Sequence, residues 1–285
     1  MAKNVLIIII SLIFCITCTQ QTQKKTKYIR LKGSDTMYTM VVRWAEEYMK
    51  QNRDISIYAE GGGSAHGFQH LIEGEVDICA SSRPMLPYEV RQLAEKHQRL
   101  GISHIVAKDA LSIYLHPANP VTDLSQKQLK DIFSGRIENW KKVGGKDMPI
   151  RVLTRSPNSG TYLYFKEHVL DDENYTNDAD IYYSTQALID EIAENENAIA
   201  YGGTAYGDRV LHCRIDGVEP TIENVIQDKY PIARYLYLYT IDTPRGHIKD
   251  FIDWILDMPG QVIVAQVGYI PLFRTDSLQN PSDLK

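Results

Sequence analysis

A regular alternation of short apolar runs with amphipathic stretches constrains this chain more than any other feature. Tyr28–Leu31 and Ile55–Ala59 have the composition of strands, and apolar residues recur at helical spacing between Met37 and Gln51. Strands that alternate with helices are typical of an α/β protein, in which helices cover a sheet. With 285 residues, 44% of them hydrophobic, the chain can bury a full core in two domains or one large one. We therefore predict an ordered α/β fold.

The other elements follow from the same pattern. Two separate strands are expected at Ile102–Val106 and Leu111–Leu115, and a helix at Ile248–Asp257 is expected to end at the Pro-Gly pair that follows it. Further strands are predicted at Val76–Ala80, Ile150–Thr154, Ile199–Tyr201 and Ile232–Thr240, and further helices from Ser64 to Gly74, at 87–99, at Leu124–Phe133 and from Gly160 to Leu170.

Four of the predicted strands end in nearly the same residue types. The motifs are GSDT at 33–36, GGGS at 61–64, SSR at 81–83 and RSPNSGT at 155–161. A helix N-terminus offers unpaired N–H groups, Ser and Thr add hydroxyl donors, and Gly lets a ligand approach the backbone. Helix capping explains any one of these motifs equally well. Four together indicate an anion site built largely from neutral donors.

Arg155 is the cation that stands beside Ser-Gly-Thr in the last of these motifs. Its planar guanidinium matches two oxygens of a tetrahedral oxyanion, although a surface or interdomain salt bridge is the alternative. The whole chain has 31 Lys and Arg against 36 Asp and Glu, a net charge of −5. Such a balance argues against general attraction to nucleic acid. The anion must therefore be held by local geometry.

The N-terminus has the pattern of an export signal. Lys3 precedes a largely apolar run from Val5 to Phe14, which is too short to span a bilayer as a helix. Residues 1–18 are therefore predicted to be a lipoprotein signal peptide with Cys18 as the lipidated residue, followed by a polar tether at 19–27. Cys15 is the alternative lipidation site, but bulky Phe14 precedes it, whereas Cys18 follows a small residue.

Other chemistries find little support in the residues. Cys79 and Cys213 match no metal motif, and their apolar surroundings favour two buried free thiols. GGGS lacks the Gly-Lys-Ser/Thr of a P-loop, and the eight His form no metal-binding set. A hydrolase would require a nucleophile elbow, but the glycines lie before Ser64 rather than around it. No metal or cofactor is predicted.

Read together, the motifs resemble the phosphate-binding lipoproteins of bacterial ABC phosphate importers. The resemblance begins with GSDTM at 33–37, GGGSAHG at 61–67 and GEVDICASSRPM at 74–85, and includes RSPNSGT at 155–161. It covers nearly the whole mature chain in order, since it also includes 109–145, NAIAYGGTAYG at 197–207, YPIARYLYLYT at 230–240 and VGYIPL at 267–272.

This resemblance implies a type 2 periplasmic-binding-protein fold, with two α/β lobes that close over a ligand cleft between them. One lobe would comprise 28–108 plus 233–285 and the other 109–232, with a hinge near Asp109 and Ala233. Carried over by motif, the phosphate-binding residues are Ser34, Asp35, Thr36, Ser64, Ser82, Arg155, Ser159, Gly160 and Thr161.

Two positions depart from the family pattern. Some relatives have Asp where this chain has Ser82, so the carboxylate that accepts the phosphate proton is Asp35 or another acid. The second loop reads Ser-Ala-His-Gly, where close relatives tend to have Ser-Gly-x-Gly, and Ala65 adopts positive φ less freely than Gly.

The resemblance implies an exported protein, anchored by lipid on the periplasmic or cell-surface side. It would capture inorganic phosphate as a monomer and deliver it to the permease and ATPase of an ABC importer, without performing a reaction. The alternative is an anchored sensory or adhesion protein that uses the same cleft. A phosphatase is a third hypothesis, but its nucleophile and base cannot be assembled from these motifs.

Overall fold

The computed structural model describes residues 26–206 and 209–273. The predicted signal at 1–18, both candidate lipidation residues Cys15 and Cys18, and most of the tether lie outside these residues. Among the residues that are described, no helix has the length and apolar character needed to cross a membrane.

The strands of the described chain form a ten-stranded sheet. They are β1 (Lys27–Gly33), β2 (Ile55–Glu60), β3 (Ile78–Ser81), β4 (Ile102–Leu115), β5 (Asp123–Leu124), β6 (Arg151–Arg155), β7 (Asp180–Tyr182), β8 (Ala198–Gly203), β9 (Leu211–Ile215) and β10 (Ala233–Thr240). Their order is β2-β1-β3-β10-β4-β8-β6-β7, with β9 paired to β4 and β5. β1 runs parallel to β2 and β3, whereas β10 is antiparallel to β3 and β4.

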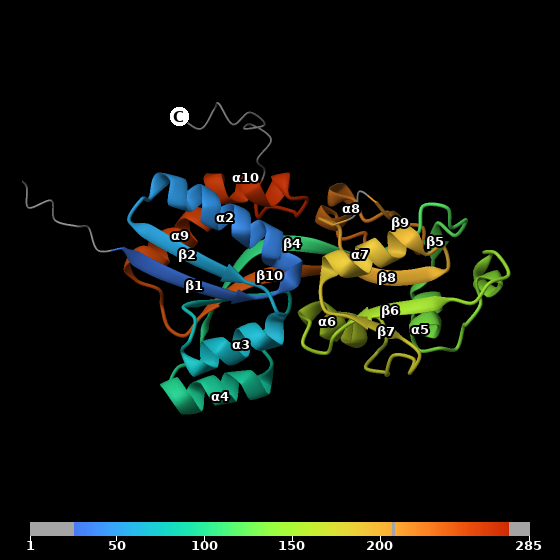
Figure 1. The fold of residues 1–285 in the computed structure, drawn as a ribbon, viewed down its shortest axis with the longest axis horizontal. Helices are drawn as coiled ribbons and strands as arrows, with labels where there is room; N and C mark the ends of the chain where they lie inside the picture. Colours follow the sequence, from blue (N-terminus) through green and yellow to red (C-terminus); the bar gives the residue numbers. More distant parts are fainter. Residues whose placement is uncertain (1–25, 207–208, 274–285) are drawn as a thin grey trace, which may run out of the picture.

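Helices cover both sides of the strands. In the first lobe α2, α9 and α10 lie on one side of β1–β3, and α3 and α4 lie on the other (Figure 1). The helical segments are η1 (Asp35–Met37), α2 (Tyr38–Gln51), α3 (Ser64–Glu73), α4 (Pro87–His97), α5 (Gln126–Phe133), η2 (Trp140–Val143), α6 (Gly160–His168), α7 (Thr185–Glu194), α8 (Ile222–Ile226), α9 (Gly246–Leu256) and α10 (Met258–Gln266).

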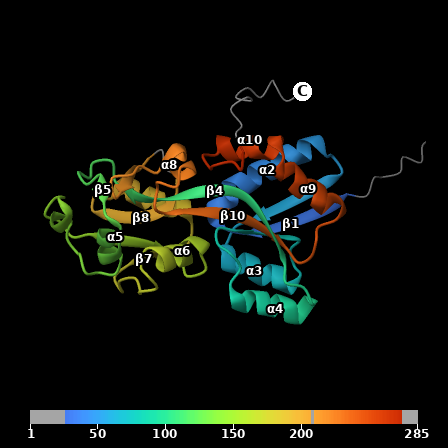
Figure 2. The same cartoon turned by 180° about the vertical axis from the view of Figure 1, so that it is seen from behind.

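The molecule has two lobes, and each has its own large hydrophobic core. One core takes its buried residues from 29–107 and 236–269. The other takes them from 110–232 together with Ile270. β4 and β10 run side by side from one lobe to the other, as seen from behind in Figure 2. The predicted arrangement of two α/β lobes is therefore confirmed.

β4 differs from the sequence-based expectation of two strands. The residues between them, which include Lys108 and Asp109, suggested a break, but they pair with β10 without interruption. Asp109 is tolerated inside a buried strand because Arg234, directly opposite it on β10, neutralises its charge. The prediction of a break here was wrong, because a partner 125 residues away leaves no local signal.

α10 is a second difference. Pro259 and Gly260 were expected to end the preceding helix, but they lie in the first turn of a new one. Asp257 caps this helix through its side chain, and Pro is well suited to a first turn because its missing N–H would have no partner there. Gly260 packs directly on the backbone of Ile255, where a methyl group would lie 2.3 Å from the carbonyl oxygen.

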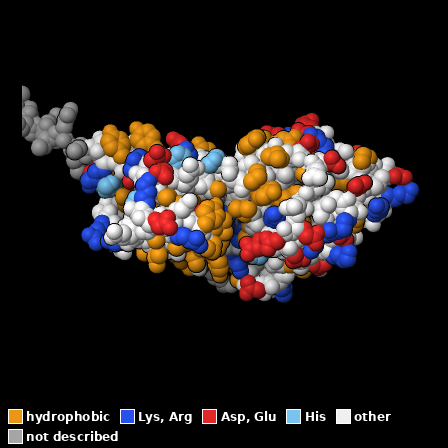
Figure 3. Space-filling model, turned by 90° about the horizontal axis from the view of Figure 1, so that it is seen from below, with side chains coloured by type: hydrophobic (Ala, Val, Ile, Leu, Met, Phe, Trp, Pro, Cys, Tyr) orange, Lys and Arg blue, Asp and Glu red, His pale blue; other side chains and the backbone are white. Residues whose placement is uncertain are grey.

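The surface carries both signs of charge. On the face shown in Figure 3, Lys and Arg side chains are intermixed with Asp and Glu side chains over both lobes. Elsewhere in the described chain, as on this face, opposite charges are close together, and the ion pairs include Arg30 with Asp77 and Arg151 with Asp180. This distribution agrees with the net charge of −5 and gives no extended basic surface on this face for a polyanion.

Candidate anion-binding site

Three of the four predicted loops meet at one edge of the first lobe. β1, β2 and β3 are parallel neighbours, so their carboxyl ends lie together. Ser82, just after β3, donates its backbone N–H to Ser64 Oγ at 3.1 Å, and the two hydroxyl oxygens are 3.4 Å apart. Gly63 donates its N–H to the Gly33 carbonyl at 2.9 Å, which joins the first loop to the second.

The fourth loop comes from β6 of the second lobe and closes against the other three. Thr161 Oγ1 lies 2.9 Å from Thr36 Oγ1 across the lobes. Gly160 faces Ser64 and Ser82 so closely that a methyl group there would lie 2.4 Å and 2.6 Å from their hydroxyl oxygens. The structure thus gathers the predicted residues, and all except Asp35 are buried: Ser34, Asp35, Thr36, Ser64, Ser82, Arg155, Ser159, Gly160 and Thr161.

Helix starts supply backbone donors at this junction. α3 begins at Ser64 and α6 at Gly160, and their first N–H groups have no partner within the helix. Ser159 caps α6, because its Oγ accepts from the N–H groups of Thr161 and Tyr162 at 3.2 and 3.4 Å. Capping is therefore part of this residue's role, and its hydroxyl hydrogen is still available as a donor.

Most of the N–H groups of Arg155 donate to acceptors within the protein. In its own lobe it donates to the Tyr182 and Tyr183 carbonyls at 3.3 and 2.9 Å and to Thr185 Oγ1 at 2.7 Å. Across the lobes its Nη2 donates to Asp35 Oδ2 at 2.9 Å. Four of the five guanidinium hydrogens are thus used. Arg155 can donate to two anion oxygens only if it first releases one of these acceptors, because a single hydrogen remains.

Asp35 lies where the two lobes meet. Its Oδ1 accepts from the Gly62 N–H at 2.8 Å and its Oδ2 accepts from Arg155. Its side chain is 18% exposed, against 3% for Arg155. Burial lowers the pKa of the Arg155 guanidinium, and the Asp35 charge opposes that shift. Together the two side chains add no net charge to the site, and each carboxylate oxygen keeps a lone pair.

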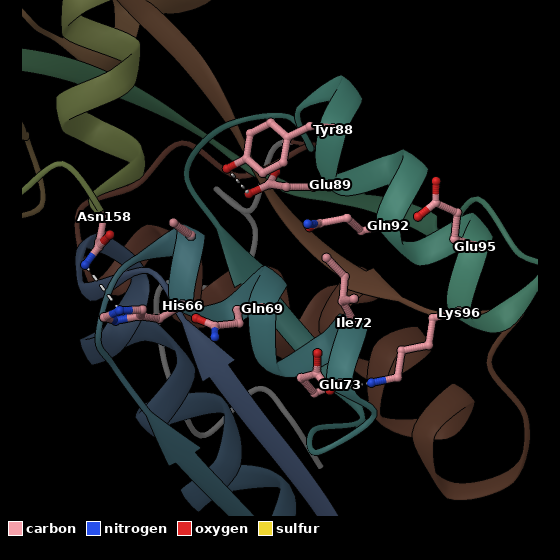
Figure 4. A pocket seen from close by; sticks show the side chains of 11 residues that line it. His66, Gln69, Ile72, Glu73, Tyr88, Glu89, Gln92, Glu95, Lys96 and Asn158 are labelled. Atoms are coloured by element: carbon pink, nitrogen blue, oxygen red, sulfur yellow. Dashed lines mark hydrogen bonds and ion pairs between the residues drawn. The ribbon is translucent and has the colours of Figure 1, made fainter.

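His66 and Asn158 also join the lobes, although sequence reasoning did not select them. The Asn158 carbonyl accepts from the Ala65 N–H at 3.1 Å, and its Nδ2 lies 3.2 Å from His66 Nε2 (Figure 4). His66 Nδ1 is 2.8 Å from the Gly62 carbonyl, so the ring donates there and accepts from the Asn158 amide. This pair borders a cavity of about 690 Å³ between α3 and α4.

Two tyrosines that the sequence did not predict to be part of the site bond the backbone of the first loop. Tyr206 donates its hydroxyl to the Asp35 carbonyl at 3.0 Å, and Tyr269 donates to the Thr36 carbonyl at 2.5 Å. Both lie in motifs of the family resemblance, TAYG and VGYIP, but the sequence did not predict that they contact the site. They hold the backbone of the first loop, not the side chains that face the junction.

The described residues do not bring potential metal ligands together into one cluster. No cluster of three or more His, Cys, Asp or Glu that could hold a metal occurs among them. Cys79 and Cys213 are buried free thiols, as predicted, and burial raises the pKa of Cys213 to about 12. The His66 ring bonds to Gly62 and Asn158, while Ser64 Oγ bonds to Ser82. Ser64 and His66 therefore do not form a nucleophile–base pair.

Comparison with known proteins agrees with this geometry. The profile of the PBP superfamily domain matches residues 19–258. The chain is 33% identical to the phosphate-binding protein PstS of Bacillus subtilis, over 88% of this chain and 82% of the relative. It is 26% identical to PstS of Borreliella burgdorferi, over 94% of this chain and 98% of the relative.

A solved structure gives the same result. A putative phosphate ABC transporter substrate-binding protein from Clostridium perfringens, solved with bound phosphate, has a TM-score of 0.80 and 32% identity. The alignment covers 87% of this chain and all of that one. The family resemblance predicted from the sequence is thereby confirmed.

Proposed function

Since this chain belongs to the PBP superfamily and is related to the phosphate-binding protein PstS, we propose that it captures inorganic phosphate outside the cytoplasm and delivers it to an ABC importer. The observation that carries this proposal is the convergence of four Ser/Thr/Gly loops from two lobes. Thr36 and Thr161 lie 2.9 Å apart, and Gly160 lies against Ser64 and Ser82. Buried hydroxyl and backbone donors of this kind suit a small oxyanion.

In the proposed mechanism the lobes close over phosphate and no bond is made or broken. Lobe I comprises 28–108 plus 233–285 and lobe II comprises 109–232, and β4 and β10 form the hinge near Asp109 and Ala233. Helix starts and hydroxyls donate to the phosphate oxygens. Asp35 accepts the phosphate O–H, and Arg155 exchanges one of its protein acceptors for phosphate.

Titration calorimetry tests this proposal directly. Inorganic phosphate, sulfate, molybdate and small carboxylates are each titrated into the purified protein at pH 7, and hydrolysis of a phosphate ester is measured on the same sample. We expect tight binding of phosphate and no hydrolysis. Binding of another anion in preference to phosphate contradicts the proposal, and hydrolysis contradicts the absence of catalysis.

The proposed location depends on the N-terminus. We propose that the mature protein is a monomer, anchored through lipidated Cys18 with a short polar tether before β1. Cys18→Ala should release the protein from the membrane fraction, while its thermal unfolding stays unchanged because the residue precedes the folded lobes. Mass spectrometry of the mature N-terminus is the measurement. Acyl groups on Cys15, or an unmodified N-terminus elsewhere, would show that the assignment is wrong.

Gly160 offers a test of the closed site. A methyl group at this position would lie 2.4 Å from Ser64 Oγ and 3.0 Å from Ser64 Cβ. Overpacking of this kind costs about 1–3 kcal/mol, so Gly160→Ala should bind phosphate ~5- to ~150-fold more weakly. Ala is favoured over Gly in a helix, so the melting temperature without phosphate should not fall. Equal affinity in calorimetry would mean that the loops do not meet around the ligand.

A further inference from the structure

A buried ion pair joins the two strands that connect the lobes, and it lies outside the predicted binding residues. Asp109 on β4 and Arg234 on β10 are direct register partners. Arg234 donates from Nε and Nη2 to Asp109 Oδ2 at 3.1 and 3.0 Å, and the two side chains are 2% and 0% exposed. Burial raises the pKa of the Asp109 carboxyl, and the Arg234 charge opposes that shift. The pair is thus fully withdrawn from water.

Arg234 also reaches the candidate site. Its Nη1 donates to the Ser82 carbonyl at 3.3 Å. The N–H of Ser82 in turn donates to Ser64 Oγ at 3.1 Å. The Arg234 guanidinium therefore binds the backbone of the loop that carries Ser82 to the junction.

The same side chain contacts the second lobe. The guanidinium lies over the Tyr164 ring, 5.6 Å from its centroid, and the Tyr164 hydroxyl donates to the Ala233 carbonyl at 2.8 Å. Tyr164 belongs to α6, which begins at Gly160. Arg234 thus touches the connecting strand, the Ser82 loop of one lobe and the helix that carries Gly160 and Thr161 from the other.

The Ser82 loop borders open space on one side, although Ser82 itself is buried. Residues 82–87 border a cavity of about 460 Å³, together with residues of α6 and β10. Within the first lobe the loop is tied to α4, because Arg83 donates to both Glu89 carboxylate oxygens at 2.8 and 2.7 Å. Arg234 adds the contact that joins this loop to the connecting strands, because it bonds the Ser82 carbonyl while Asp109 fixes its own orientation.

Stability alone does not account for such a pair. Withdrawing two charges from water costs roughly as much as their attraction returns, and an apolar pair of similar size is often as stable. Resting on the proposed function, we propose that Arg234 is a positioning residue for phosphate. Held by Asp109, it sets the Ser82 loop relative to α6, so that Ser82 and Gly160 reach their binding positions together when the lobes close.

The test separates positioning from stability by removing the pair in two ways. Arg234→Met alone leaves Asp109 buried without its partner, so both the melting temperature and the phosphate affinity should fall. The double variant Asp109→Leu with Arg234→Met removes both charges and should regain much of the melting temperature. Its phosphate affinity should stay at least ~10-fold below wild type, because the Ser82 carbonyl still lacks a charged donor.

Two further variants complete the set, all measured by calorimetry with inorganic phosphate and by thermal unfolding without it. Arg234→Lys keeps the charge beside Asp109 but lacks a planar group that also reaches Ser82. The phosphate affinity should therefore fall clearly, while the melting temperature without phosphate should change little. Arg151→Met is the matched control, since it removes an Arg from β6 that pairs with Asp180 and Glu191 and bonds no predicted binding residue. Its phosphate affinity should equal that of wild type.

Wild-type affinity in the Lys variant, or full recovery of affinity with stability in the double variant, would overturn the positioning role. The Lys variant decides the question if the double variant fails to fold. Failure of the wild-type protein to bind phosphate would instead refute the proposed function, so the two failures are distinguishable.

Discussion

Arg155→Ala should bind phosphate ~30- to ~5,000-fold more weakly than wild type, a loss of about 2–5 kcal/mol that is typical of truncating one side of a buried charge pair. The guanidinium is 3% exposed and pairs with Asp35 across the lobes. Its removal deletes the one Arg among the predicted residues and leaves a carboxylate beside an incoming anion. Arg155→Lys should recover part of the loss, because an ammonium lacks the planar fork.

The structure adds a second expected effect of Arg155→Ala. A side chain that contacted only ligand would leave the empty protein's melting temperature unchanged. Arg155, however, bonds the Tyr182 and Tyr183 carbonyls and Thr185 in its own lobe, so thermal unfolding should occur at lower temperature. Calorimetry and thermal unfolding measure the two effects, with Arg151→Ala at the other end of β6 as control. An Arg155→Ala variant with wild-type affinity would place this residue outside the site.

Asp35→Asn should weaken phosphate binding and reduce or abolish the preference for phosphate over sulfate. At neutral pH phosphate carries at least one O–H and sulfate carries none. An ionised carboxylate accepts that O–H in a charge-assisted hydrogen bond, whereas it meets sulfate as acceptor against acceptor. Discrimination then comes from repulsion of the wrong anion, and an amide, which donates to either anion, removes that repulsion.

The ion pair with Arg155 strengthens this expectation. Asn cannot hold the guanidinium by charge, so Arg155 would be free to turn toward a dianion. Competition calorimetry with phosphate and sulfate at pH 7 is the measurement. Asp77→Asn is a matched control, because Asp77 also pairs with an Arg and is 21% exposed. It lies just before the first residue of β3, at the end of that strand away from Ser82. If Asp35→Asn keeps full discrimination, another acid accepts the phosphate proton.

The sequence predicted the parts of the fold that are specified locally. The helix expected at Met37–Gln51 is observed at Tyr38–Gln51, because Met40, Val41 and Trp44 lie on one apolar face. The helix α7 was not predicted, although Leu188, Ile189 and Ile192 are buried on one side. The β4 break was wrong because continuity there depends on the distant Asp109–Arg234 pair, whereas the α10 start has the local signals Asp257 and Pro259, which were interpreted only as the end of the preceding helix.

The candidate site likewise combines features with local sequence signals and features that depend on distant contacts. Its loops were found because Ser, Thr and Gly at strand ends are local signals, and the parallel strands bring three of them together. The orientation of Arg155 was not predictable, since it depends on the carbonyls of Tyr182, at the end of β7, and of Tyr183 just after it, where the sequence has no recognisable motif. The contact between His66 and Asn158 joins residues 92 positions apart, and nothing in either motif links them.

The pairing of β4 in both lobes limits the kind of motion that the lobes can make. Ile102 to Ile105 and Ala107 to Ala110 pair with β10, with a register shift at Val106, and Leu111 to Leu115 pair with β8, so the strand has a neighbour in both lobes. A paired ribbon resists stretching and sharp bending, but strands readily change their twist. We expect opening to be a rotation about these strands, in which Gly160 and Thr161 leave Ser64 and Thr36 at the same time. A rotation of this kind would separate all four loops in one step, so an anion would contact either the complete set of donors or solvent.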